Sequence, residues 1–338
     1  MKKPMILLAG TVFFCILISV LISVLFYGDE GSDLSNFDNK IDKLEKSLYE
    51  KVDSKSPTIS MYNSKTGEVQ NVDIETFLYG VLSMEMSSDF SIEALKAQAV
   101  AARTYIIYKI ENNINQGHKG ADICTDYSHC QAYATYQELK NLKGDEWIEN
   151  SYPIIKRAVD DTKGQILTYD DKAILPLYFS TSSGMTENSE EVFMMQYPYL
   201  KSVSSPYEED SPKYYTESTI GRDDFIDLLR SKYSNISISK YDLENQVKII
   251  ERTTAGSVKI IKIGNKQLNG RDIRSIFNLN SSNFDISFVG DNVVFKVKGY
   301  GHGVGMSQWG AEGMANRSHT YDEILFHYYT DTEIKDIY

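Results

Sequence analysis

The sequence predicts an α+β fold, in which a mixed core of helices and short strands carries a smaller β-rich inserted subdomain and follows one transmembrane helix. Three observations predict this arrangement. An uncharged apolar run stands at the N-terminus, helical and alternating patterns mix along residues 57–205 and 296–338, and β patterns dominate residues 206–295. The 338 residues contain no internal repeat and no low-complexity tract.

The apolar run extends from Pro4 to Tyr27 without a charged residue. At about 1.5 Å per helical residue, it can cross a bilayer core of about 30 Å. Lysines precede the run and acidic residues follow it, so residues 1–27 are predicted to be a cytoplasmic tip and a transmembrane anchor, with the rest of the chain outside. A cleaved signal peptide is the alternative, but its apolar region would span only about 7–15 residues.

Residues 28–56 are polar, and Phe37, Ile41, Leu44 and Leu48 recur there at helical spacing. We expect a short amphipathic helical linker, which packs either on its own domain or on a partner helix. The chain has a formal net charge of −12. This acidic balance argues against nucleic acid as a partner, because phosphate binding needs clustered lysine and arginine.

The first part of the core, residues 57–205, opens with a predicted hairpin from residues 58–62 and 68–72. A helix with one apolar face follows from Ile74, with Asp73 as its cap. An alanine-rich helix is predicted over residues 92–109, and its small side chains suit a central position. Further along we expect a helix near 152–161 and short strands such as 173–180.

The inserted subdomain, residues 206–295, is predicted to hold a helix near 222–233 and strands at 247–252, 258–263 and 293–297. The core resumes at residues 296–338. There a glycine-rich stretch leads into a helix from about Met306, and Thr320 with Glu323 predicts a capping box at the last helix.

Glu85 is the first candidate for chemistry, because it ends an apolar helix face between Met84 and Met86. An apolar environment disfavours the charged carboxylate and raises its pKa, which suits a general acid near neutral pH. Lys96 and Arg103 lie seven residues apart on the next helix and could line the same cleft. The alternative is that Glu85 is an ordinary exposed glutamate at a helix end and that Arg103 pairs with an acidic residue.

Two further segments combine unusual composition with element ends. One is a hydroxyl-rich turn after a strand, Phe179 through Thr186. Its hydroxyls and N–H groups suit a sugar ligand, and the alternative is a polar loop without a binding role. The other is the glycine-rich run Gly299 through Gly310, which contains His302, Gln308 and Trp309. It lacks the Lys-Ser/Thr pair of a nucleotide-binding loop.

These segments, together with Glu93 through Tyr105 and Pro198-Tyr199-Leu200, resemble the stage II sporulation protein D family, the lytic transglycosylases of endospore formers. The matching blocks span about 230 residues in the family's order. Two departures are Ser87, where the family usually has proline after Glu-Met, and Ser183-Gly184, where it often has two glycines.

The resemblance implies cleavage of the bond between N-acetylmuramic acid and N-acetylglucosamine in glycan strands stripped of stem peptides, leaving 1,6-anhydro ends. Glu85 matches the family's catalytic glutamate. The resemblance also implies seven residues that hold substrate: Lys96, Arg103, Ser182, Ser183, Tyr199, His302 and Gln308. It implies work in forespore engulfment, at the mother-cell membrane facing the septal wall, beside stage II sporulation proteins P and M.

A metal site is predicted from His118, Cys124, His129 and Cys130, which fall within thirteen residues. Four nitrogen and sulfur ligands suit a closed tetrahedral zinc site of structural type, and some clostridial members of the family look similar here. A Cys124–Cys130 disulfide is the alternative. We expect zinc and no organic cofactor.

Two other functions stay open from the sequence. Related domains serve as amidase enhancers, which bind without cleaving. A glycoside hydrolase with two carboxylates would pair Glu85 with Glu187 or Glu190.

Overall fold

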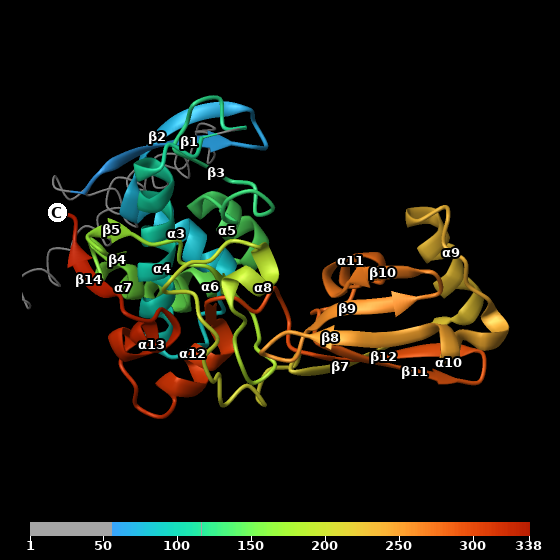
Figure 1. Ribbon diagram of the computed structural model, residues 1–338. Helices are drawn as coiled ribbons and strands as arrows, with labels where there is room; N and C mark the ends of the chain where they lie inside the picture. Colours follow the sequence, from blue (N-terminus) through green and yellow to red (C-terminus); the bar gives the residue numbers. More distant parts are fainter. Residues whose placement is uncertain (1–55, 116) are drawn as a thin grey trace, which may run out of the picture. The chain divides into compact units, whose positions relative to one another are not determined.

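The computed structural model describes residues 56–115 and 117–338. The predicted anchor at residues 4–27 and the amphipathic pattern at 37–48 lie outside these residues. Among the helices that are described, none combines the length and the hydropathy needed to cross a bilayer. The described fold mixes helices with several small sheets, as predicted (Figure 1).

The first sheet confirms the predicted hairpin. Strands β1 (Thr58–Asn63) and β2 (Glu68–Asp73) pair antiparallel, and the chain turns at Gly67, whose φ of +73° favours glycine. The short strand β3 (Ile123–Cys124) joins the other edge of β1 in parallel. This pairing fixes one cysteine of the predicted metal site in a sheet.

Two helices form the centre of the core. Helix α3 (Ile74–Glu85) begins at the predicted cap, where the Asp73 side chain accepts a hydrogen bond from the Thr76 N–H. Helix α4 (Ile92–Glu111) contacts helices from both ends of the chain, and all five of its alanines are completely buried. Figure 1 shows α4 in the middle of the core, which confirms the central position that its alanines predict.

The remaining core elements surround α4. They are α5 (Tyr136–Lys143), α6 (Asp145–Asn150), α7 (Tyr152–Asp160), β4 (Gln165–Tyr169), α8 (Ser189–Phe193), α12 (Gln308–Ala315), α13 (Tyr321–Tyr328) and β14 (Glu333–Asp336). Strand β14 pairs antiparallel with β4, so the C-terminus closes the core. The capping box between Thr320 and Glu323 is present as predicted.

Two predicted elements differ from the structure. The strand expected at 173–180 is interrupted, because Pro176 has no N–H to donate to a neighbouring strand; only β5 (Lys172–Ala173) and β6 (Tyr178–Phe179) remain. The helix expected from Met306 begins at Gln308. The two residues before it form β13 (Met306–Ser307), which pairs in parallel with β6.

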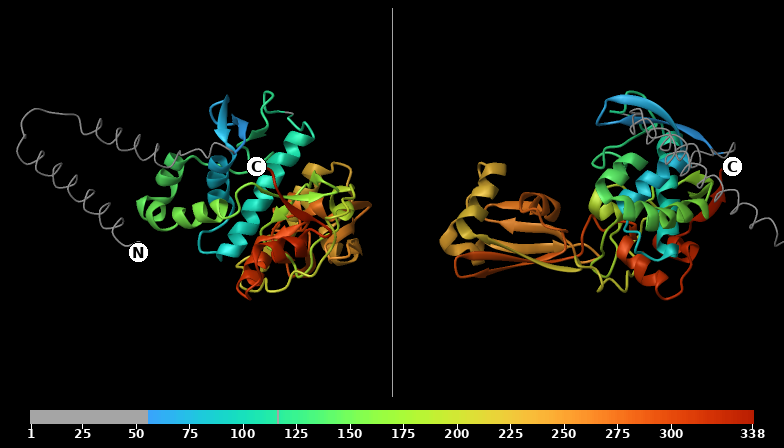
Figure 2. Two further views of the ribbon diagram at one scale, coloured as in Figure 1. Left: turned by 90° about the vertical axis from the view of Figure 1, so that its left-hand side faces the viewer. Right: turned by 180° about the vertical axis from the view of Figure 1, so that it is seen from behind.

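A second hydrophobic cluster forms between Ile220 and Val297, separate from the cluster around α4. Phe225 and Phe277 stack at its centre, with ring centroids 4.8 Å apart. Two three-stranded sheets, ordered β11-β12-β7 and β10-β9-β8, enclose the cluster (gold and orange in Figure 2). The elements here are β7 (Tyr215–Gly221), α9 (Arg222–Lys232), η1 (Lys240–Asp242), α10 (Leu243–Gln246), β8 (Val247–Arg252), β9 (Val258–Ile263), β10 (Lys266–Asn269), α11 (Gly270–Ile276), β11 (Phe284–Val289) and β12 (Asn292–Lys298).

Candidate active site

Glu85 is the last residue of α3, and its side chain is half-buried. Its neighbour Met86 is buried, whereas Met84 is 38% exposed, so only one of the two flanking methionines shields it. Burial raises the pKa of the Glu85 carboxyl above its ordinary value. A carboxylic acid with a raised pKa keeps its proton closer to neutral pH, which is what a general acid requires.

Two groups hold the Glu85 carboxyl in place. The backbone N–H of Ala132 donates to Oε1 at 3.3 Å, and the Tyr178 hydroxyl on β6 faces the carboxyl and lowers its pKa in part. The Tyr178 hydroxyl itself accepts a hydrogen bond from Gln131 Nε2 at 3.2 Å. Donors from the 131–132 segment thus reach Glu85 both directly and through Tyr178.

Gln308, one of the predicted substrate residues, lies at the same point. Its Nε2 donates to the backbone carbonyl of Glu85 at 3.2 Å and to Gln98 Oε1 at 3.4 Å. Gln98 is completely buried, and its own Nε2 has no partner among the described residues. The start of α12 is therefore joined to the end of α3 by a cluster of amide groups beside the candidate acid.

No second carboxylate is hydrogen-bonded to the Glu85 side chain within residues 56–115 and 117–338. Glu187 is buried, and its carboxylate lies at the β8–β9 turn, where it accepts a hydrogen bond from Thr253 Oγ1 at 3.0 Å. Glu190 is exposed at the surface of α8. The described contacts therefore do not pair Glu85 with either of the carboxylates considered for a hydrolase.

Arg103 was expected to line the cleft, and this expectation is wrong. Its side chain is 0% exposed and forms two hydrogen bonds to Glu75, at 2.8 Å from Nε and 2.6 Å from Nη2. Nη1 donates to the carbonyl of Gln165. A fully enclosed guanidinium with these partners holds α3, α4 and β4 together and cannot reach a polymer.

Three other predicted substrate residues also serve the core. Lys96 pairs with Glu93 at 2.9 Å and with Asp161 at 3.3 Å. The Tyr199 hydroxyl accepts from the Leu175 N–H at 3.0 Å, and its side chain is buried. Ser182 is 1% exposed, and its hydroxyl accepts from the Gly184 N–H. The Lys96 ammonium and the hydroxyls of Tyr199 and Ser182 thus each have a partner within the protein, and of the three only Ser182 belongs to the hydroxyl-rich turn.

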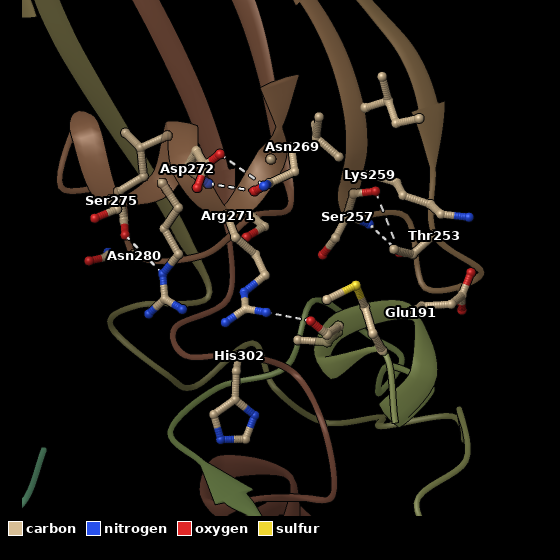
Figure 3. Close-up of a pocket in the computed structure, with 18 of the residues that line it drawn as sticks. Glu191, Thr253, Ser257, Lys259, Asn269, Arg271, Asp272, Ser275, Asn280 and His302 are labelled. Atoms are coloured by element: carbon tan, nitrogen blue, oxygen red, sulfur yellow. Dashed lines mark hydrogen bonds between the residues drawn. The ribbon is translucent and has the colours of Figure 1, made fainter. Parts of the chain in front are cut away.

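Ser183 and His302 are more accessible. Both are half-buried, and the Ser183 hydroxyl accepts from Asn283 Nδ2 at 3.0 Å. His302 packs between the rings of Phe179 and Phe193, at 5.6 and 5.5 Å, and it borders a cavity beside the β9–α11 region (Figure 3). No described contact joins either residue directly to the Glu85 carboxyl, and both line one smaller pocket beside the hydroxyl-rich turn.

The predicted metal ligands come together in the structure. One ligand atom from each of His118, Cys124, His129 and Cys130 lies within 4.8 Å of all the others. His118 Nε2 is 2.8 Å from His129 Nδ1 and 3.2 Å from Cys130 Sγ, and Cys124 Sγ is 3.5 Å from His129 Nδ1. The edges of a tetrahedral zinc site with nitrogen and sulfur ligands are about 3.3–3.8 Å. The two contacts of His118 are shorter than these edges and the Cys124–His129 contact matches them, whereas the number and type of the four donors suit zinc.

Both cysteines are free thiols, so the alternative disulfide is not formed. Lys109 Nζ donates to Cys130 Sγ at 3.4 Å, so this thiol has a basic side chain as its neighbour. The chain then passes from Cys130 directly to Gln131 and Ala132, the residues that donate to Tyr178 and Glu85. The short segment from Cys130 to Ala132 therefore links the four histidine and cysteine side chains to the candidate acid.

Four residues beside Glu85 were not predicted as site residues: Gln98, Gln131, Ala132 and Tyr178. Tyr178 is the first residue of the strand end that leads into the hydroxyl-rich turn, and that position was a usable signal. Ala132 acts through its backbone N–H, which leaves no mark in the sequence.

The comparisons with known proteins agree with one another. A family model described as "Stage II sporulation protein" matches residues 62–169. Stage II sporulation protein D of Bacillus subtilis (strain 168) is 38% identical over 82% of this chain and 79% of its own length, and that of Bacillus amyloliquefaciens is 37% identical over the same shares. An amidase enhancer of Bacillus subtilis is 27% identical over 76% of this chain but only 40% of its own length. On this evidence the chain belongs to the stage II sporulation protein D family.

Proposed function

We propose that this protein is a peptidoglycan lytic transglycosylase that cleaves the bond between N-acetylmuramic acid and N-acetylglucosamine in strands without stem peptides. The observation that carries the proposal is the single half-buried carboxyl of Glu85, whose pKa is raised by burial. Its place in a family of sporulation proteins supports a wall substrate, because engulfment of a forespore requires remodelling of the septal wall.

In the proposed reaction Glu85 acts first as an acid and then as a base. It donates its proton to the glycosidic oxygen, which leaves as the hydroxyl of N-acetylglucosamine when its bond to the anomeric carbon breaks. The 6-hydroxyl of the same muramic acid attacks that carbon and returns its proton to Glu85. No water is consumed, and the product carries a 1,6-anhydro ring.

One carboxyl is enough for this route. Ordinary glycosidases need two carboxylates, because one must activate a water or form a covalent intermediate. An internal hydroxyl replaces that second group, and well-oriented intramolecular nucleophiles reach effective molarities of about 10⁵ M or more. Among the described residues, no other carboxylate is hydrogen-bonded to the Glu85 side chain, which agrees with a reaction that needs only one carboxyl.

We also propose that His118, Cys124, His129 and Cys130 bind one zinc ion. A four-coordinate ion leaves no open position for substrate, so its contribution would be structural. The protein groups that depend on it are Gln131 and Ala132, which follow the last ligand and orient Tyr178 and Glu85.

The proposed setting is the mother-cell membrane, to which residues 1–27 would anchor the chain by a single pass with its N-terminus inside the cytoplasm. From there the protein would work on the septal wall beside stage II sporulation proteins P and M. An anchor of this kind would keep Glu85 near the membrane surface.

The test is a product assay with the full chain in detergent. Glycan strands stripped of peptides should yield fragments with anhydro ends, identified by mass, and Glu85→Gln should yield none. Glu149→Gln is the matched control, because this exposed glutamate on α6 has no hydrogen bond to Glu85. Reducing-end products would point to hydrolysis, and equal cleavage by Glu85→Gln and the parent would refute the assignment.

The similarity to an amidase enhancer favours one alternative, a module that binds the wall or an amidase without cleaving. In that case the purified chain releases no product from stripped strands at any pH. It would nevertheless increase the rate of an amidase on intact wall.

A further inference from the structure

A cavity of about 1070 Å³ lies beside the inserted segment, and Glu85 is not among the residues that line it. Its walls come from α8, β9, α11 and the loop that carries His302 (Figure 3). The volume is at the upper end of the range of about 300–1,000 Å³ that is typical of ligand sites. A sugar unit of a longer chain fits within such a space.

Two arginines of α11 line this cavity. Arg271 and Arg274 are one helical turn apart and so share a face of the helix. Arg271 donates to the carbonyl of Val192 on α8 and lies over the Phe193 ring, and Figure 3 shows it extending toward His302. Arg274 donates from Nε to the carbonyl of Leu279 at 3.3 Å.

Neither arginine has a carboxylate partner among the residues that the structure describes. A guanidinium has five N–H donors, and the hydrogen bond described above uses only one donor of each arginine. Arg274 is half-buried, and a half-buried positive charge without a counter-ion is costly, so its remaining donors favour a negatively charged ligand. Arg271 is exposed, so a ligand in the cavity can reach its remaining donors without displacing a protein partner. Planar carboxylate matches the fork of a guanidinium and can accept two hydrogen bonds from it.

The three acidic residues that line the cavity form no ion pair with these arginines. Glu190 is exposed and accepts a hydrogen bond from the Ser189 hydroxyl at 3.4 Å. Asp272 accepts from the Asn269 side chain at 2.9 Å and from the Tyr233 hydroxyl at 3.0 Å. Glu191 accepts from Asn188 and from the Thr254 N–H. Lys259, the other basic residue of the lining, already pairs with Glu251 at 2.6 Å.

His302 stands opposite the arginines and adds no charge. Burial lowers the pKa of its imidazole to about 4, and the nearby positive charge of Arg274 contributes. The ring is therefore neutral near pH 7 and can exchange hydrogen bonds with a hydroxyl or an acetamide. The cavity as a whole combines two guanidinium groups that have no carboxylate partner among the described residues with uncharged polar groups, such as Asn280 and Ser275.

We propose that this cavity binds a muramic acid unit through its free lactyl carboxylate, which Arg271 and Arg274 hold. The identity of the sugar rests on the proposed function, whereas the preference for a carboxylate rests on the arginines. A lactyl group that carries a stem peptide is an amide without charge at that position. Removal of the peptide creates the carboxylate, so the cavity distinguishes stripped strands from peptide-bearing ones.

The reaction that supplies the substrate is therefore an amide hydrolysis that releases the peptide from the lactyl group. The acidic character of the chain makes a local cationic site necessary, because a formal net charge of −12 repels an anionic polymer elsewhere.

The experiment measures binding, so that it does not depend on cleavage. The full chain carrying Glu85→Gln is titrated with stripped glycan strands and with the same strands after conversion of the lactyl carboxylates to methylamides. We expect binding of the amidated strands to be about tenfold weaker or more, the usual effect of losing a hydrogen-bonded charge. The double variant Arg271→Gln, Arg274→Gln should bind both strands equally weakly.

Arg230→Gln is the matched control, because Arg230 belongs to the same segment and donates to the carbonyl of Ile238, but does not line the cavity. It should keep the full preference for the carboxylate. Equal binding of native and amidated strands by the parent chain would overturn the proposal, and so would a preference that survives in a folded double variant. The parent comparison needs no variant of the cavity, so a double variant that fails to fold leaves the test intact.

Failure of this proposal and failure of the proposed function have different signatures. If the wild-type chain yields no anhydro product but prefers the carboxylate, the cavity assignment stands and the transglycosylase assignment falls. If anhydro products form from native and amidated strands at equal rates and with equal affinity, the transglycosylase assignment stands and the cavity assignment falls. Tighter binding of a phosphate polymer than of stripped strands would also refute the muramic acid assignment.

Discussion

Replacing Arg103 by methionine should destabilise the protein by about 3–5 kcal/mol, because the substitution leaves Glu75 buried without its counter-charge. Arg103 and Glu75 are 0% and 2% exposed, and two hydrogen bonds join them. Glu75 keeps a bond from the Tyr338 hydroxyl at 2.6 Å, which favours the lower part of that range. For a domain of this size the loss corresponds to a lowering of Tm on the order of 10 °C.

Urea and thermal unfolding of the full chain measure this effect, and strand binding is measured below the transition. Arg157→Met is the control, because the Arg157 side chain is 69% exposed in its ion pair with Asp161. Loss of this exposed pair should change the free energy of unfolding by about 0.5 kcal/mol or less. The double variant Arg103→Met, Glu75→Leu should recover part of the loss, since it removes the stranded charge. An Arg103→Met protein that keeps its Tm but no longer binds glycan would refute the structural role and restore the substrate role.

Three further predictions follow from the site and its surroundings. Tyr178→Phe removes a hydroxyl that lowers the pKa of Glu85, so the alkaline limb of the cleavage profile should move to higher pH; an unmoved limb would show that Tyr178 does not face the acid. Removing zinc with a chelator should lower Tm and cleavage together, and metal analysis that finds far less than one equivalent per chain would contradict the site. Burial raises the pKa of Glu208 to about 7, so the folded state favours its protonated form. The stabilisation of the folded state by protonated Glu208 is fully present below about pH 4.5 and is lost as pH rises through about 7, a change of about 3 kcal/mol. Unfolding curves compared at about pH 5 and 8 measure this change, and Glu208→Gln should abolish it.

Local patterns predicted the elements that depend on neighbours in the chain. The apolar face after Asp73, the alanines of α4 and the Thr320–Glu323 box are periodic or capping signals, and each appears where expected. The prediction of a continuous strand at 173–180 was wrong. Pro176 interrupts the apolar run, and its missing N–H prevents strand pairing there even though the side-chain pattern favours a strand.

The sequence by itself determined the family, through ordered blocks around Glu85 and Gly299–Gly310, and it marked the four histidine and cysteine side chains that the fold gathers within 4.8 Å. Only the tertiary structure decided which polar residues of those blocks are available to a ligand. Arg103 and Gln308 looked equally suited to bind sugar, yet one is sealed by Glu75 and the other reaches the end of α3 beside Glu85. Helical periodicity shows that a residue lies on a given face, but the segment that covers that face is distant in the chain, so only long-range packing decides whether the group is exposed, paired or poised for chemistry.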